Sequence, residues 1–230
     1  MMLHQTFNFA TIGSTQEEAK KIARRLPAGS VAVVAAKAQE GGRGRSDHIW
    51  VSPKGNLYLT FILPIPEQRK MERSNLSLVL ATTTVEFLEG LGVEAKIKWP
   101  NDLLIGRAKL GGILGEGGDP LFLGIGINVA SRPALDRPTA SLNETAATQF
   151  DLEHLKEGVV TSFLEGYEKW LEEGFAPFFA LWSSYLIHQP DDLLKIGAKS
   201  AKFLKTDLSG GIWIEMEGQK KLILSGEIDF

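Results

Sequence analysis

The fold of this chain is constrained most by three β-strand patterns that follow one another closely in its middle. Apolar residues fill residues 103–105 and 110–115, and the turn signal Gly106-Arg107 lies between them, which predicts an antiparallel hairpin. Residues 121–129 supply a neighbouring strand after a second short connection. Parallel strands need a crossover of about a dozen residues or more, so these strands cannot belong to a doubly wound fold. The pattern predicts an α+β protein.

Helices and further strands surround this hairpin in the sequence. Thr15 and Glu18 have the spacing of a capping box, which predicts the start of a helix that ends near Leu26. Asp151 stands in the N-cap position of a long amphipathic helix that ends near Leu171. Apolar spacing predicts other helices over residues 74–91 and 175–187, and β-rich apolar runs predict strands over residues 30–37, 56–63 and 95–99.

The pattern changes after Gln189-Pro190. Four short strand-forming runs follow, separated by glycine turns, at residues 193–194, 201–204, 211–216 and 221–224. This is too little chain for a large domain and enough for a small β-barrel. We therefore expect a large domain over residues 1–188 and a small C-terminal β-barrel domain over residues 189–230.

Composition excludes several classes of protein. The 230 residues contain no cysteine, which excludes disulfides, thiolate metal sites and a thiol nucleophile. The four histidines lack the spacing of zinc ligands. A net charge of −3 gives no overall attraction for nucleic acid. No signal peptide and no membrane-spanning run is visible, so we expect a soluble, cytoplasmic protein with no membrane partner.

Two polar clusters point to a site that binds anions. The run GGRGR at residues 41–45 combines free backbone N–H groups with guanidinium charge, and Trp50 beyond it offers a flat face for a base. The run is neither a Walker A motif nor a dinucleotide fingerprint, and by itself a flexible turn or an RGG-like nucleic-acid segment would explain it equally well. KWPND at residues 98–102 gathers an ammonium, an amide and a carboxylate, although Asn and Asp also favour ordinary turns. Together the clusters suggest a site for a carboxylate or acyl substrate and a nucleotide.

Two further clusters lie in the predicted strands. Lys109 is a lone ammonium in an apolar strand, and Gly111-Gly112 beside it leaves the backbone open to the approach of another molecule. GIGIN at residues 124–128 repeats this arrangement, with the amide of Asn128 at the strand end. Buried strands with bulges would explain either cluster alone, but they explain the joint occurrence of all four clusters poorly.

The clusters occur in an order and at a spacing that resemble those of biotin–protein ligases. The resemblance rests on Ser14-Thr15, on Gln39 with GRGR at 42–45 and Trp50, on KWPND at 98–102, on Lys109-Leu110-x-Gly112-Ile113-Leu114, and on Gly126-Ile127-Asn128. It extends from about residue 10 to the last strand-like run at residues 226–228. Repressor members of this family carry an N-terminal helix-turn-helix domain. Because the motifs start at Ser14 here, we expect the monofunctional form, without that domain and without a nucleic-acid partner.

The resemblance implies a fold and a reaction. The fold is α+β, with a mixed sheet that has helices on one side, similar to class II aminoacyl-tRNA synthetases, plus an SH3-like C-terminal β-barrel, so that residues 1–188 form the catalytic biotin- and ATP-binding domain. The biotin carboxylate attacks the α-phosphorus of ATP, with Mg²⁺, and gives biotinyl-5′-AMP and pyrophosphate. The ε-amine of a lysine on a biotin carboxyl carrier domain of acetyl-CoA carboxylase type then attacks the mixed anhydride. A homodimer is a further expectation.

The resemblance also assigns roles to single residues. Lys109 would bridge the biotin carboxylate and the phosphoryl oxygens, Arg43 would hold the carboxylate and the α-phosphate, and Asp102 would steer or deprotonate the incoming lysine, so these three are the expected catalytic residues. The expected biotin-binding residues are Ser14, Thr15, Gln16, Gln39, Gly42, Arg43, Gly44, Arg45, Lys109 and Gly112. The expected ATP-binding residues are Arg45, His48, Trp50, Asn101, Lys109 and Asn128. No residue is assigned as a protein ligand of a metal.

The sequence departs from the family pattern at two positions. Two rival functions are also compatible with it. His48, preceded by Ser46-Asp47, stands where the family commonly has an arginine, and Gln16 stands where it usually has an asparagine. The first departure affects the expected ATP affinity more than the type of reaction. Lipoate– and octanoate–protein ligases or transferases share the architecture but usually lack the pairing of GRGR with KWPND. The other rival is a catalytically weak biotin-binding protein.

Overall fold

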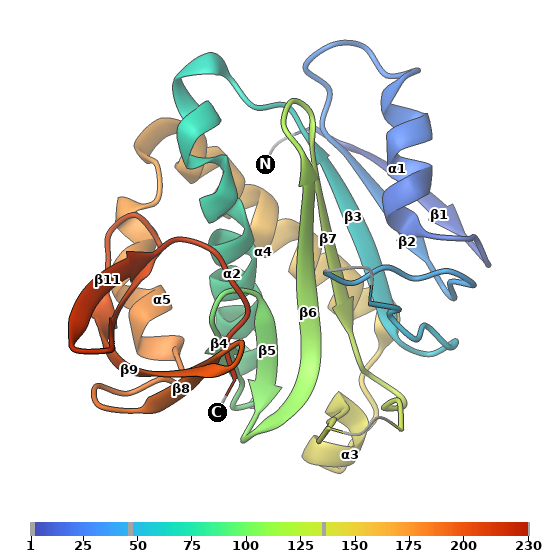
Figure 1. Ribbon diagram of the computed structural model, residues 1–230. Helices are drawn as coiled ribbons and strands as arrows, with labels where there is room; N and C mark the ends of the chain where they lie inside the picture. The colour runs from blue at the N-terminus through green and yellow to red at the C-terminus, as the bar shows by residue number, and fades with distance from the viewer. Residues whose placement is uncertain (1–2, 46–47, 135–136, 230) are drawn as a thin grey trace.

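The computed structural model describes residues 3–45, 48–134 and 137–229, and these residues contain two β-sheets, of which the larger is covered by helices (Figure 1). The strands of the larger sheet are β1 (Gln5–Phe9), β2 (Ala32–Ala36), β3 (Leu57–Leu63), β4 (Lys96–Lys98), β5 (Asp102–Ile105), β6 (Ala108–Gly117) and β7 (Leu121–Ile127). Those of the smaller sheet are β8 (Leu193–Ile196), β9 (Lys199–Thr206), β10 (Ile212–Met216) and β11 (Gln219–Ile223). The helices are α1 (Thr15–Ala23), α2 (Leu76–Gly90), α3 (Leu142–Ala146), α4 (Leu152–Glu173) and α5 (Phe179–Tyr185), with 3₁₀ turns η1 (Glu67–Asn75) and η2 (Ala176–Phe178).

The seven-stranded sheet has the strand order β1-β2-β3-β7-β6-β5-β4 and is mixed. β1 runs parallel to β2, and the other neighbours are antiparallel. The predicted hairpin of β5 and β6 is confirmed, and β7 lies beside β6 with Gly126 opposite Gly112. The edge strand β1 was not predicted, because its five residues are largely exposed and only Phe7 and Phe9 alternate as a buried face would require.

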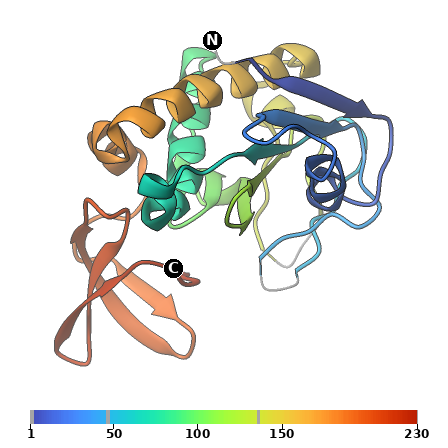
Figure 2. The ribbon, with the colours of Figure 1, turned by 90° about the horizontal axis from the view of Figure 1, so that it is seen from above.

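The two faces of this sheet carry different helices. Along β2, Val33 and Ala35 face the main core, which α2 and α4 cover. Ala32 and Val34 point the other way and pack with Ala19 of α1. Figure 2 shows α1 and α4 on opposite sides of the sheet. The expectation of helices on one side therefore holds for α2 and α4 and is wrong for α1.

The helix ends differ in part from the predicted ones. Ser14, not Thr15, is the N-cap of α1, and its side chain makes no capping hydrogen bond, so the predicted capping box is absent. Asp151 caps α4 as predicted, because its side chain accepts from the backbone N–H of His154 at 2.8 Å. The helix predicted over residues 175–187 is a 3₁₀ turn followed by α5. No helix in the described part of the chain is both long and apolar enough to cross a membrane.

The smaller sheet is antiparallel, has the strand order β11-β10-β9-β8 and forms the expected small C-terminal unit. Residue Asp229 returns beside Lys195 of β8. The unit lies against the β4 end of the larger sheet (Figure 1). There the buried indole of Trp99 donates through Nε1 to the carbonyl of Gly210 at 3.0 Å. The connection from α5 also joins the sheet edge, since Leu186 bridges Ile97.

Candidate active site

A cleft of about 440 Å³ opens on the α1 face of the larger sheet, next to the C-terminal unit. Its floor is made of strand residues without side chains. Gly112 of β6 and Gly126 of β7 lie opposite each other, and Gly124 lies two residues before Gly126 on β7. A Cβ atom on Gly126 would come within 2.5 Å of the Trp50 indole nitrogen, and one on Gly124 would come within 3.3 Å of Gln16. Glycine is therefore what keeps the floor open.

At one end of the cleft the polar groups are neutral and closely interlocked. The side-chain oxygen of Gln39 accepts from the backbone N–H of Thr15 at 2.7 Å and from its hydroxyl at 3.0 Å. Thr60 donates to the same hydroxyl at 2.9 Å, and Gln39 donates through Nε2 to Ser52 at 2.9 Å. These contacts fix the start of α1 against β3 and against the loop that precedes β3.

Two oxygens at this end have no partner. Ser14 is 5% exposed and Gln16 is 3% exposed. Among the residues that the structure describes, neither Ser14 Oγ nor Gln16 Oε1 has a hydrogen-bond partner. The amide nitrogen of Gln16 is used, since it donates to the carbonyl of Leu114 at 3.2 Å. Because buried polar atoms are nearly always satisfied, this end is suited to a ligand that offers hydrogen-bond donors.

The middle of the cleft holds an ion pair. Lys109 Nζ lies 2.5 Å from Asp102 Oδ1, and the two side chains are only 14% and 16% exposed. Burial lowers the pKa of Lys109 below its ordinary value, although Asp102 acts in the opposite direction. The backbone of Lys109 is held as well, because it exchanges hydrogen bonds with Pro138 and Ala140. The ammonium is thus a partly desolvated charge in a fixed place, which suits it to a developing negative charge.

The Gly-Arg loop, residues 41–45 with their return over residues 48–50, forms one wall. It is a narrow hairpin: Trp50 donates its backbone N–H to Gly42 at 2.9 Å, and Gly44 donates to His48 at 2.7 Å. A Cβ on Gly42 would lie 2.3 Å from the Trp50 carbonyl oxygen, so this close return requires glycine. His48 is exposed at the rim of the cleft, and the neighbouring Ser46 and Asp47 lie outside the described residues.

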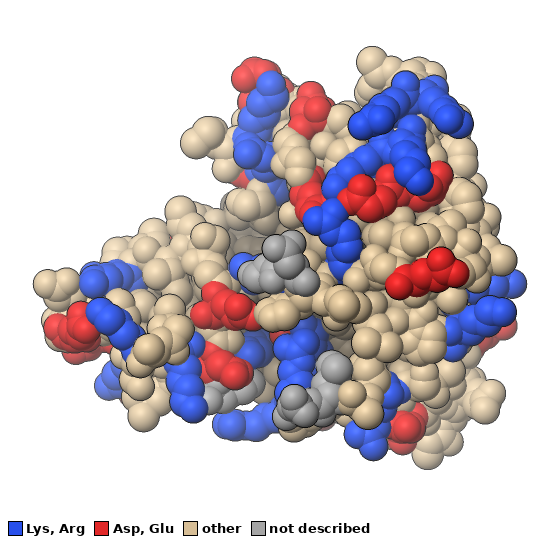
Figure 3. All heavy atoms as spheres, turned by 45° about the vertical axis from the view of Figure 1, so that its right-hand side comes forward, with Lys and Arg blue, Asp and Glu red and all other residues tan. Residues whose placement is uncertain are grey.

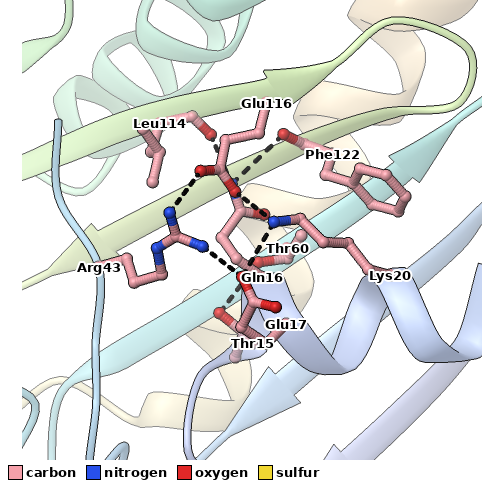
Figure 4. A network of polar contacts seen from close by, with 9 residues as sticks. All are labelled: Thr15, Gln16, Glu17, Lys20, Arg43, Thr60, Leu114, Glu116 and Phe122. Atoms are coloured by element: carbon pink, nitrogen blue, oxygen red, sulfur yellow. Dashed lines mark hydrogen bonds and ion pairs between the residues drawn. The ribbon is translucent and has the colours of Figure 1, made fainter. Parts of the chain in front are cut away.

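Arg45 and Arg43 are held by different partners. Arg45 donates through Nη1 to Asn101 Oδ1 at 2.9 Å and through Nη2 to the carbonyl of Gly226 at 3.0 Å. It therefore joins the loop to the KWPND turn and to the C-terminal unit. Arg43 instead pairs with Glu17 and with Glu116 (Figure 4). A direct contact of its guanidinium with a substrate carboxylate would require it to leave these partners.

The indole of Trp50 lies on the glycine floor. Its centroid is 5.4 Å from Lys109 Nζ, a cation–π distance. Trp50 Nε1 is buried and, in the described ranges of the chain, has no hydrogen-bond partner. Trp50 thus borders the space beside Lys109 where a flat ring would lie.

The structure brings nearly all of the expected residues together. The cleft is lined by Ser14, Thr15, Gln16, Gln39, Arg43, Gly44, Arg45, His48, Trp50, Asn101, Asp102, Lys109 and Gly112. Gly42 and Asn128 do not line it. Gly42 allows the close return of the Gly-Arg loop. Asn128 is 1% exposed and donates to the carbonyl of Ala140 at 3.1 Å, and it thereby holds the segment that bonds to the backbone of Lys109.

Sequence reasoning missed several residues of the cleft. Arg107 and Arg137 line it beside Lys109, and residues 227–229 of the C-terminal unit close it. Basic side chains reach the surface in the middle of this face (Figure 3). Gly106-Arg107 was recognised as a hairpin turn, but nothing in the sequence indicated that this turn and the end of the chain meet at one site.

Known proteins share this sequence and this arrangement. Residues 9–118 match the model of the biotin/lipoate A/B protein ligase family. The chain is 31% identical over 235 residues to the bifunctional ligase/repressor BirA of Bacillus subtilis, and this alignment covers 95% of this chain and 71% of that protein. It is 28% identical to the biotin–[acetyl-CoA-carboxylase] ligase of Paracoccus denitrificans, over 96% and 98% of the two chains. Among solved structures, the biotin protein ligase of Aquifex aeolicus in complex with biotin and ATP is similar, with a TM-score of 0.84, 28% identity, and coverage of 98% of this chain and 97% of that one.

Proposed function

Because the chain belongs to the biotin/lipoate A/B protein ligase family, we propose that it is an ATP-dependent biotin–protein ligase. It activates biotin to biotinyl-5′-AMP and then transfers biotin to a specific lysine of a biotin carboxyl carrier domain of acetyl-CoA carboxylase type. The observation that carries the proposal is the division of one cleft into two ends. The unpartnered oxygens of Ser14 and Gln16 lie at the neutral end of the cleft. The partly desolvated ammonium of Lys109 lies in its middle, toward the other end.

The neutral end fits the uncharged ring of biotin. A ureido group has two N–H donors and one carbonyl acceptor, and each must be met when the group is buried. Ser14 Oγ and Gln16 Oε1 are free to accept hydrogen bonds, and the Ser14 hydroxyl can also donate one. We propose that Thr15 and Gln39 hold these residues in place, and that Gly112 leaves room for the side chain of biotin.

The proposed first step takes place at Lys109. The biotin carboxylate and the α-phosphate of ATP repel each other, so a positive charge must lie between them before the oxygen attacks phosphorus. Lys109 is placed to contact both groups, and Gly44 and Arg45 of the Gly-Arg loop lie on the phosphate side of it. Trp50 is proposed to lie against the adenine, with Asn101 and His48 at the nucleotide end. For Asn128 we propose an indirect role in ATP binding, through the segment that supports Lys109.

The second step needs a neutral amine. The incoming carrier lysine is protonated at neutral pH and must lose a proton before it can attack the anhydride. Asp102 is the proposed group that steers this amine, because its carboxylate lies at the cleft and 2.5 Å from Lys109, where the anhydride carbonyl would be held.

Magnesium is proposed to enter with ATP. Mg²⁺ commonly keeps several waters and binds through substrate phosphates plus one or two carboxylates. The described residues contain no group of three or more His, Asp or Glu side chains that could hold a metal. Because Asp102 already pairs with Lys109, we propose that substrate phosphates and water hold the ion, and we assign it no protein ligand.

Transfer of labelled biotin is the test. The protein, biotin and MgATP are incubated with a biotin carboxyl carrier domain, and the domain is analysed by mass spectrometry. A ligase adds one biotin to one lysine. The lipoate or octanoate alternative would add a lipoyl or octanoyl group and leave biotin untouched, and a catalytically weak biotin-binding protein would retain biotin without transfer. Either result would refute the proposed function.

We propose four further properties. We propose a domain boundary between residues 188 and 189, because the chain leaves the β4 edge there and enters the smaller sheet. The net charge of −3 supports the absence of a nucleic-acid partner. The lack of cysteine suits a cytoplasmic location. A homodimer is proposed, and light scattering across a concentration series tests it.

A further inference from the structure

Four charged side chains form a closed set of ion pairs at the Gln16 end of the cleft (Figure 4). The Arg43 guanidinium contacts Glu17 of α1 through Nη1 and Glu116 of β6 through Nη2, the latter at 3.1 Å. Lys20 of α1 contacts the same two carboxylates, at 2.9 Å and 3.1 Å. We call these four residues the Arg43 network. Of these four residues, the resemblance to biotin–protein ligases assigned a role only to Arg43.

The Arg43 network connects the Gly-Arg loop to two elements of the larger domain. α1 lies on β2, β3 and β7, where Ala19 packs with Ala32, Val34 and Ile62. β6 is one strand further along the sheet, and Gln16 of α1 reaches it by donating to the carbonyl of Leu114. Arg43 comes from the Gly-Arg loop and contacts one carboxylate on α1 and one on β6. The loop is thereby fastened beside the Gln16 end of the cleft, where the biotin ring is proposed to lie.

The charges of the Arg43 network cancel. Two cations face two carboxylates, so the network adds no net charge to the neutral end of the cleft. The pKa of Glu17 lies below its ordinary value, chiefly because Lys20 donates a hydrogen bond to it and in smaller part because Arg43 does. The network therefore offers no net attraction to a biotin carboxylate at the end where the ring is proposed to bind.

Each arginine holds a different side of the same loop. Arg45 fastens it to Asn101 and to Gly226, while Arg43 fastens it to α1 and β6. Gly44, the single residue between them, gives the backbone little stiffness at this point. The position of the loop over the cleft therefore depends on these side-chain contacts.

We propose that Glu116 and Glu17 are positioning residues that hold Arg43 against α1 and β6 and so keep the Gly-Arg loop closed over bound biotin and biotinyl-5′-AMP. This inference rests on the proposed ligase function and deepens it. The closed loop retains the reactive adenylate until the carrier lysine arrives. When the network is broken, the loop opens more often and the adenylate is released before transfer.

The test measures how fast the adenylate leaves. Biotinyl-5′-AMP is formed on the enzyme from labelled biotin and MgATP without carrier, and its release is followed after an excess of unlabelled biotin is added. Glu116→Gln keeps the shape of the side chain and removes its charge. Partly exposed ion pairs contribute little individually, so we expect release about threefold to fivefold faster in Glu116→Gln and faster still in the Glu17→Gln/Glu116→Gln double variant. The KM for biotin rises in parallel, and the KM for ATP does not change.

Glu18→Gln is the matched control. Glu18 lies on the same helix and pairs with Lys21, a partner that is 65% exposed, away from the Arg43 network. It should release the adenylate at the wild-type rate. A double-mutant cycle then separates positioning from general stability. If Glu116 acts through Arg43, then Arg43→Gln and Arg43→Gln/Glu116→Gln release the adenylate equally fast.

Three results would overturn the inference. They are wild-type release in Glu116→Gln, equal acceleration in Glu18→Gln, and additive effects in the cycle. If wild-type protein forms no adenylate, the proposed function fails and this inference fails with it. If wild-type protein forms the adenylate and Glu116→Gln retains it fully, only the role of the Arg43 network is refuted.

Discussion

Replacement of Lys109 by methionine tests the centre of the proposed mechanism. Methionine keeps the length of the side chain and removes its charge. A unit charge about 4 Å from a developing anion contributes about 4 kcal/mol at the effective dielectric of about 20 that suits such sites. Asp102 already neutralises part of the Lys109 charge, since the two side chains are 2.5 Å apart. We therefore expect a loss of about 3 kcal/mol in transition-state stabilisation, about 10²-fold in the rate of adenylate formation.

The assay is single-turnover release of pyrophosphate from MgATP and biotin. Lys109→Met leaves the half-buried carboxylate of Asp102 without its partner, which lowers thermal stability. The double variant Lys109→Met/Asp102→Asn removes that unpaired charge, so it should recover the melting temperature without recovering the rate. Lys96→Met, in the neighbouring β4, is the control for loss of a lysine from this sheet. Pyrophosphate release within a factor of about three of the wild-type rate would refute the role of Lys109.

The pH dependence follows from the same group. The protonated ammonium is the active form, and burial lowers the pKa of Lys109 below the ordinary 10.5. The rate of adenylate formation should therefore fall as pH rises through the lowered pKa, and it should begin to fall before an exposed lysine would lose its proton. A rate that stays constant up to the pH at which exposed lysines titrate would contradict the desolvated environment of Lys109.

Four other substitutions test other parts of the cleft. Arg43→Ala should weaken biotin binding and speed adenylate loss, whereas Arg45→Ala should mainly impair ATP-dependent steps; equal effects on both ligands in calorimetry would show an undivided loop. His48→Arg should tighten ATP binding, because a permanent guanidinium then stands at the nucleotide rim, and an unchanged isotherm would place His48 in solvent. Gly126→Ala should keep the fold but displace Trp50, whose indole lies 2.5 Å from the added Cβ, so intrinsic fluorescence should change and ligand affinity should fall.

The sequence predicted the strands and the main helices because their signals are local. The turn at Gly106-Arg107 and the apolar runs on both sides of it specify a hairpin without information from the rest of the chain. The same holds for the N-cap at Asp151. The clustered motifs also predicted the cleft, because they lie at strand ends and turns that the sheet brings to one face.

The features that the sequence did not predict depend on contacts between distant segments. β1 carries only a weak alternation, and its place is fixed by pairing with β2. Glu116 has the pattern of an outward-facing strand residue, and only the tertiary fold shows that it meets Arg43. The side of the sheet taken by α1 depends on Ala32 and Val34, in a strand that is buried on both faces and so indicates neither.

The KWPND turn explains why the C-terminal unit reaches the cleft at all. Trp99 donates to the carbonyl of Gly210, whereas Asn101, two residues later, accepts a hydrogen bond from Arg45 of the Gly-Arg loop. Arg45 completes its contacts with the carbonyl of Gly226, which belongs to the same C-terminal unit. One short turn therefore sets the distance between that unit and the loop, and a shift of the unit would remove one of the two fixed partners of Arg45. The C-terminal unit therefore contacts the proposed nucleotide end of the cleft through this arginine.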